Sequence, residues 1–316
     1  MKQTNRFVFD MLDQDLPDAA GDRIFRAGQP VSAAAAGDNV VIKVPFVRQV
    51  LKNMFLFSAE DETPVLRDVV VRAYGDKLIR ITTGTGTLPD DAANPMLSFA
   101  PDLKQSPLFV EAVTGSAEGW LIKDKDGVKR AFINTKQEKR QIWSDLQPEP
   151  PLVFEASVYP DGRTEVPFAG YDTFFPHQNE SFSLGYVEKN GAADRWLYSL
   201  KSLPGEKYAG TGERFAGMNL AGKTFVLENT DGLGNNSRRA YKNVPFYISS
   251  RGYGVLIMTS AHVRLSLADI STRAAQGLIE DDALDIFIIG GANVEEIVRN
   301  YRRLTGFPSD VPLWSY

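Results

Sequence analysis

Residues 208–254 read YAGTGERFAGMNLAGKTFVLENTDGLGNNSRRAYKNVPFYISSRGYG, and the end of this stretch predicts how the chain folds. Residues 246–248 are apolar, residues 255–258 are apolar, and an Arg-Gly-Tyr-Gly turn at 251–254 lies between the two runs. Aromatic and β-branched residues on both sides of a glycine-rich turn are typical of a β-hairpin. The stretch therefore predicts two neighbouring antiparallel strands.

The same arrangement occurs earlier in the chain. Residues 69–74 and 78–82 flank a Gly-Asp-Lys turn, and residues 120–123 and 128–133 flank Asp126-Gly127. Many short strands with Gly/Asp turns and few helices predict a mainly β protein, a large antiparallel β-sandwich. No internal repeat is visible, which argues against a propeller.

One helix is predicted after the last apolar strand. Asn293 can cap it, and Glu296 three residues later completes a capping box. Gly306 and Pro308 end it. Its apolar face is formed by Val294, Ile297, Val298, Tyr301 and Leu304.

The residues beyond this helix predict a connector. The sequence Pro-Ser-Asp-Val-Pro at 308–312 follows the helix, and the chain stops abruptly at the apolar Trp-Ser-Tyr of 314–316. A natural C-terminus more often ends in polar residues. This ending favours a chain that belongs to a longer protein.

The composition excludes several classes of partner and cofactor. The 316 residues have a net charge of −5 and only short basic clusters such as 136–140, so nucleic acid is not an expected partner. Cysteine is absent, which excludes disulfides and cysteine-based zinc sites. The two histidines, His177 and His262, have no ligand spacing. We therefore expect no metal and no other cofactor.

The N-terminus predicts a cytoplasmic location. Asp10 and Asp13 interrupt its apolar residues, so no signal peptide is visible. No apolar run is long enough to cross a bilayer, and a membrane is not an expected partner.

Residues 182–316 resemble the N-terminal β-domain of glycoside hydrolase family 31, the α-glucosidases and α-xylosidases. The most specific match is Tyr-Lys-Asn-Val-Pro-Phe-Tyr at 241–247 followed by the turn at 251–254, which is similar to the α-xylosidase type. The resemblance implies a galactose-mutarotase-like sandwich over residues 1–290. It also implies a connector helix and lead-in over residues 291–316, ending just before a missing catalytic (β/α)8 barrel.

Asp231 is the first candidate for substrate binding. It lies in a loop rich in Asn, Asp and Gly, a composition that also suits a purely structural turn. Loops are nevertheless where binding residues gather, and a carboxylate accepts strong hydrogen bonds from sugar hydroxyls. The match Asn229-Thr230-Asp231 to the family implies that Asp231 contacts sugar hydroxyls, with Asn229 beside it.

The remaining candidates are mainly structural. Gly210 and Gly212 are expected to permit tight backbone packing, with Glu213 and Arg214 forming an internal ion pair. A phosphate-binding role is not supported, because no Lys-Ser/Thr pair follows the glycines. Pro245 is expected just before a strand that sends Phe246 and Ile248 into the core, and Gly252 and Gly254 form the turn that follows. Lys242 and Asn243 are candidates for lining the mouth of a cleft.

The resemblance also implies what the chain does. Family 31 enzymes are retaining α-glycosidases that need two carboxyl groups, and both come from the barrel in this family. The chain is therefore expected not to be catalytic alone. It is expected to pack against its own barrel, wall the active-site pocket and contact an α-linked oligosaccharide or glycoside.

Three alternatives stay open. A free-standing carbohydrate-binding module needs an exposed aromatic platform, for which Trp120, Trp143 and Trp196 are candidates. An aldose epimerase on the same fold needs a general acid and base, commonly a His with a Glu, which makes His177 and His262 of interest. An oligomerisation module would make the chain part of a homo-oligomer.

Overall fold

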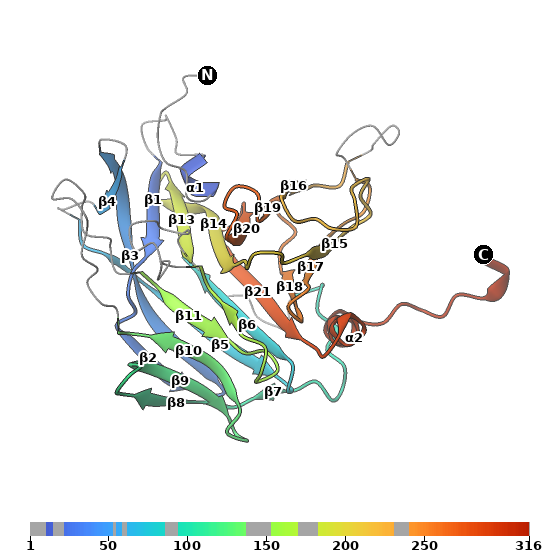
Figure 1. The fold of residues 1–316 in the computed structure, drawn as a ribbon, viewed down its shortest axis with the longest axis horizontal. Coiled ribbons are helices and arrows are strands. Elements are labelled where there is room, and N and C mark those ends of the chain that lie inside the picture. The colour runs from blue at the N-terminus through green and yellow to red at the C-terminus, as the bar shows by residue number, and fades with distance from the viewer. Residues whose placement is uncertain are drawn as a thin grey trace.

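A computed structural model describes residues 11–14, 22–52, 55–58, 62–85, 94–136, 153–169, 183–230 and 240–315. Almost all of the regular structure in these ranges is antiparallel β-sheet (Figure 1). The predicted mainly β class is confirmed. None of the described helices is long and apolar enough to span a membrane.

The larger sheet has 16 strands, and its continuous path runs from β15 to β16. In path order its strands are β15 (Tyr208–Gly212), β17 (Asn243–Ser249), β18 (Tyr253–Ile257), β21 (Ala283–Gly290), β6 (Leu78–Gly84), β5 (Val65–Tyr74), β3 (Asn39–Lys52), β1 (Arg23–Ala27), β13 (Leu184–Lys189), β14 (Ala192–Lys201), β20 (Ala274–Ile279), β19 (Val263–Leu267) and β16 (Lys223–Leu227). Off this path, β2 (Ser32–Ala36) and β4 (Phe55–Ser58) pair with β3, and β7 (Gln105–Ser106) pairs with β5.

The smaller sheet has five strands and lies in front of β2, β3 and β5 in Figure 1. In order they are β12 (Val166–Pro167), β11 (Glu155–Val158), β10 (Lys129–Asn134), β9 (Gly119–Asp124) and β8 (Leu108–Val113). The helical elements are α1 (Met11–Gln14), α2 (Val294–Thr305) and the 3-10 turn η2 (Leu313–Ser315).

The main core contains buried side chains from both sheets, and it also joins distant strands of the larger sheet such as β14 and β21. Ile122 and Ile133 of the smaller sheet are buried in one cluster with Phe46, Tyr186 and Trp196 of the larger sheet. The ring centroids of Tyr186 and Trp196 are 4.8 Å apart. Fully burying aromatic side chains of this size contributes a large share of the stabilising apolar area.

The predicted hairpins are confirmed by the strand registers. Val71 of β5 pairs with Ile81 of β6, and Leu121 of β9 pairs with Phe132 of β10. Tyr247 of β17 pairs with Val255 of β18.

Helix α2 packs on the outer face of the larger sheet. Ile297 and Leu304 are buried in a second cluster that includes Phe246 and Ile248 of β17. Asn293 caps the helix by accepting a hydrogen bond from the Glu296 backbone, as predicted.

Two details of this helix differ from the prediction. Val294 is 59% exposed rather than part of the buried face, because the first buried side chain of the helix is Ile297. The Glu296 carboxylate accepts from the Ala292 backbone, one residue before the expected N-cap amide.

A buried arginine joins the smaller sheet to the larger one. The Arg130 guanidinium is 2% exposed and donates to the Asp124 carboxylate at 2.8 Å. It also donates to the backbone carbonyls of Asp76, in the β5–β6 turn, and Pro160, both at 2.8 Å. One side chain therefore holds turns from both sheets, and its charge is compensated by Asp124.

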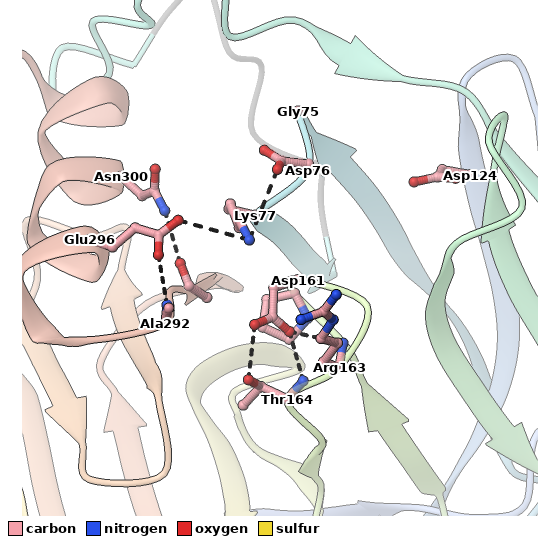
Figure 2. Close-up of polar contacts among 12 residues, drawn as sticks. Gly75, Asp76, Lys77, Asp124, Asp161, Arg163, Thr164, Ala292, Glu296 and Asn300 are labelled. Atoms are coloured by element: carbon pink, nitrogen blue, oxygen red, sulfur yellow. Dashed lines mark hydrogen bonds and ion pairs between the residues drawn. The ribbon is translucent and has the colours of Figure 1, made fainter.

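Beside this junction, Lys77 links the β5–β6 turn to helix α2. Figure 2 shows Lys77 between Asp76 and Glu296, with its amine 4.0 Å and 3.8 Å from their carboxylates. Asn300 of α2 donates to the Gly290 carbonyl at 2.9 Å. These contacts fix α2 against the β5–β6 turn and against the end of β21.

Asp124 and Asp161 are among the carboxylates at this end of the molecule whose pKa values are lowered. Burial opposes ionisation of Asp124, but hydrogen bonds from the Val128 backbone and Arg130 outweigh it and hold the pKa of Asp124 below its usual 3.8. Burial also opposes ionisation of Asp161, yet backbone and side-chain hydrogen bonds from Thr164 and the backbone of Arg163 lower its pKa (Figure 2).

We predict that stability falls as the pH drops below about 4. The unfolded chain then binds protons that the folded Asp124 and Asp161 resist, so the free energy of unfolding decreases until the folded carboxylates are also protonated. Urea unfolding at pH 7, 5, 4 and 3 measures this slope. In Asp124→Asn the acid loss should be shallower, and an unchanged slope in that variant would contradict the assignment.

Candidate functional site

A β-bulge lies where β15 passes β17. Gly210 pairs with Tyr247 and Gly212 pairs with Asn243, with a register shift between them. The φ angles of Gly210, Thr211 and Gly212 are +117°, +66° and +86°. A Cβ atom on Gly212 would lie 2.1 Å from the Lys242 carbonyl oxygen, so only glycine fits there.

The bulge holds the side chain of Arg214. Thr211 is fully buried, and its hydroxyl accepts a hydrogen bond of 3.1 Å from Arg214 Nε. Arg214 Nη2 donates to the Val226 carbonyl at 3.3 Å, and the guanidinium lies 4.7 Å from the centre of the Phe225 ring. Burial lowers the pKa of Arg214 below its ordinary value, but an arginine remains charged at neutral pH.

The predicted Glu213–Arg214 ion pair is wrong. Glu213 is exposed and faces Lys242, with 3.5 Å between its carboxylate and the lysine amine. Arg214 contacts Thr211 and Asn243 instead.

Asn243, a candidate for lining a cleft, is half-buried, and its side chain is hydrogen-bonded to neighbouring residues of the protein. Its Oδ1 accepts a hydrogen bond from Arg214 Nη2. Its Nδ2 donates to the carbonyl oxygens of Glu228 at 2.7 Å and Ala240 at 3.2 Å, and to Asn229 Oδ1 at 2.9 Å. All the hydrogen-bonding groups of this amide are therefore used by the protein itself.

Asn229 lies at the edge of this network. Its Oδ1 also accepts from the Asn243 backbone at 2.8 Å, and Asn229 forms an isolated parallel bridge with Ala240. The Thr230 backbone donates to the Ala240 carbonyl at 3.2 Å. Asp231 lies outside the described residues, so its contact with substrate remains a prediction.

A cavity of about 450 Å³ opens on the other side of Arg214. Its lining includes the Phe225 ring and the Lys223 amine, which donates to the Asn219 carbonyl at 2.9 Å. The Thr224 hydroxyl donates to Asp269 at 2.7 Å. The full lining is Arg214, Phe215, Ala216, Gly217, Gly222, Lys223, Thr224, Phe225 and Asp269. The sequence did not predict this cavity, because Asp269 reaches it from a distant strand end.

The hairpin β17–β18 supports the site from behind. Pro245 lies within β17 rather than before the strand as predicted. It is at the bulge and is not among the residues that pair with either neighbouring strand. Gly252 occupies the turn with a φ of +90°. A Cβ atom on Gly254 would lie 2.7 Å from the Phe246 ring, so this glycine permits close packing.

The structure limits the alternative sites. Trp196 is fully buried and cannot form an exposed sugar platform, and Trp120 is half-buried against the core. Trp143 and His177 lie outside the described residues. His262 is half-exposed, with its Nδ1 3.5 Å from Glu280 and its Nε2 3.9 Å from Glu228.

A buried acid was missed by the sequence analysis. Glu206 is 7% exposed and accepts hydrogen bonds from the Tyr253 hydroxyl at 3.0 Å, the Leu203 backbone at 2.9 Å and the Ser249 hydroxyl. Burial raises the pKa of Tyr253 well above its usual value. Glu206 follows Pro-Gly in sequence, a turn signal that gives no indication of burial.

Residues 68–265 match the family described as the glycosyl hydrolase 31 N-terminal galactose mutarotase-like domain. This match covers more than half of the chain. The chain belongs to that family. The predicted resemblance and the galactose-mutarotase-like fold are both confirmed.

The relatives of this family 31 domain include two α-xylosidases. The α-xylosidase of Emericella nidulans is 42% identical over 147 residues, which is 42% of this chain and 19% of that protein. Alpha-xylosidase XylQ of Lactiplantibacillus pentosus is 38% identical over 111 residues, which is 35% of this chain and 14% of that protein. The matched part is thus less than a fifth of either relative.

Solved structures agree with the fold. The cycloalternan-forming enzyme of Listeria monocytogenes, in complex with a pentasaccharide substrate, superposes with a TM-score of 0.62 at 15% identity over 93% of this chain and 24% of its own. A GH31 α-xylosidase from a soil metagenome, complexed with xylose, has a TM-score of 0.57 at 14% identity over 87% of this chain and 35% of its own.

We predict that Gly212→Ala destabilises this family 31 domain by about 3 kcal/mol or more. The left-handed backbone costs an alanine about 1–2 kcal/mol, and the contact with Lys242 forces the backbone apart at a further cost of similar size. Gly222→Ala is the matched control, because Gly222 has a φ of +72° but open space around its Cβ position. Urea unfolding compares the two, and equal costs would contradict the close approach.

Proposed function

We propose that this chain is the N-terminal domain of a retaining α-glycosidase, an α-xylosidase or α-glucosidase. The observation that carries the proposal is the 42% identity to an α-xylosidase over 147 residues. The domain would wall one side of the active-site pocket, and Asp231 would accept hydrogen bonds from the sugar. Such contacts raise specificity, because a sugar that lacks the matching hydroxyl leaves polar groups unpaired.

The stems on either side of Asp231 support this role. These stems end at Thr230 and Ala240, and the Asn243 amide binds both sides. Lys242 and Glu213 are exposed beside them and would lie at the mouth of the pocket. The partner of this surface would be an α-linked oligosaccharide or glycoside.

The C-terminal segment supports a connection to a catalytic barrel. Residues 291–316 would form the connector and residues 1–290 the sandwich. Beyond α2, Phe307, Val311, Leu313 and Trp314 are all more than half exposed. Several exposed apolar side chains within eight residues favour a surface that another domain covers. The cytoplasmic location remains a prediction.

An interaction module is the second candidate. Phe215 is 73% exposed and Met218 is 89% exposed beside the cavity at Arg214. These side chains favour a contact with another protein surface, either the barrel or a second copy of the chain. If the partner is a second copy of the chain, a homo-oligomer would form without the barrel. If the partner is the barrel, it would not.

We predict that the 316-residue chain does not hydrolyse p-nitrophenyl α-xyloside or α-glucoside, whereas the gene product read past Tyr316 does. In that longer protein, Asp231→Ala should lower kcat/KM about 10- to 100-fold, as expected for the loss of charge-assisted hydrogen bonds. Asp38→Ala, in the exposed turn between β2 and β3, is the control and should retain activity. Hydrolysis by the 316-residue chain would contradict the proposal.

A further inference from the structure

We propose that the cavity beside Arg214 binds a sugar that carries a carboxylate or phosphate group. The volume of about 450 Å³ is within the usual range of small-molecule sites. The described lining combines two cations, one carboxylate and two phenylalanine rings. The proposal goes beyond the function proposed above, because α-xylosides and α-glucosides carry no charge.

Arg214 brings to the cavity a positive charge that is not offset by a neighbouring carboxylate. Its Nε donates to Thr211, and its Nη2 donates to the Val226 carbonyl and to Asn243. These acceptors are uncharged, and within the described ranges neither an ion pair of Arg214 nor a partner for its two Nη1 donors is present. Burial lowers the pKa of Arg214, so an anion in the cavity would stabilise its charged form.

Lys223 adds a second cation to the same lining. Its amine donates to the Asn219 carbonyl at 2.9 Å, and an ammonium group carries three donors. Asp269 is the one carboxylate in the described lining, so the two cations leave these residues with a net charge of +1. Charge-assisted hydrogen bonds from the cations favour an anionic oxygen over a neutral one.

Asp269 indicates that the ligand also carries hydroxyl groups. Its Oδ2 accepts from the Thr224 hydroxyl at 2.7 Å, and a carboxylate has about four acceptor sites. A simple anion would be repelled by Asp269, whereas a hydroxyl group would donate to it. An anionic group and hydroxyl groups on one small molecule are the chemistry of a sugar acid or a sugar phosphate.

The two phenylalanines have different roles in this cavity. Phe225 is 8% exposed, and its ring centre lies 4.7 Å from the Arg214 guanidinium, which it helps to hold in place. Phe215 is 73% exposed and lines the same cavity. An exposed ring beside hydrogen-bonding groups offers the apolar face of a sugar ring a surface on which to pack.

The first test is titration calorimetry of the 316-residue chain with four probes at matched ionic strength. Glucuronate and glucose 6-phosphate should bind with a Kd of about 1 mM or lower. Glucose and inorganic phosphate should each bind at least about tenfold more weakly, because each lacks one kind of contact. Equal affinities for glucuronate and glucose would overturn the anionic requirement, and phosphate binding as tightly as glucose 6-phosphate would overturn the assignment to a sugar.

The second test assigns the binding to the cavity. Lys223→Met should weaken glucuronate binding about tenfold, because a charge-assisted hydrogen bond is lost. Phe215→Ala should weaken it about three- to tenfold, and truncating this exposed ring should leave the fold intact. Lys125→Met is the matched control, since Lys125 is 64% exposed in the β9–β10 turn of the smaller sheet and should not affect binding.

The outcome of the second test is decisive for the location. If Lys223→Met and Phe215→Ala both bind glucuronate as tightly as the parent chain, the ligand does not occupy this cavity and the proposal is overturned. Both tests measure binding and not hydrolysis, so they give their answer whether or not the proposed glycosidase function holds.

Discussion

The closure of the larger sheet on itself is the constraint on which the candidate site depends. The sheet path ends at β15 and β16, and among the described residues no strand ladder pairs these two ends. Instead, Arg214 donates to the Val226 carbonyl and Asn243 donates to the Glu228 carbonyl. Side chains thus satisfy backbone carbonyls that would otherwise be unpaired at the open edges of the sheet. These carbonyls lie a few residues before Asp231 in sequence.

Closure by side chains has a consequence for function. A ladder would specify only a register, whereas an arginine and an asparagine specify the positions of individual carbonyls on both stems of a loop. Function on this fold is therefore carried by the site residues rather than by the sandwich, as is general for widely used folds.

Local chemistry in the sequence was enough to predict the hairpins, since their turn residues and flanking strands are neighbours in the chain, as at the β17–β18 turn. The helix cap at Asn293 was predictable for the same reason. Three other features could not be predicted, because each depends on segments that only the fold brings together. They are the contact of Arg130 with the Asp76 carbonyl, the burial of Glu206 and the contacts of Asn243. Adjacency also misled, since Glu213 and Arg214 are neighbours in sequence but face different partners.

Strand β17 connects the two ends of the proposed active-site wall. Asn243, at its start, holds the stems of the Asp231 loop, and Phe246, three residues later, stacks on Tyr301 of α2 at a centroid distance of 4.4 Å. Helix α2 is held at its other side by Lys77 and Asn300 (Figure 2). If a catalytic barrel follows α2, strand β17 holds both the helix that leads to it and the stems at Glu228 and Ala240. The position of these stems relative to the barrel would then be set mainly by this strand, and little by the linker.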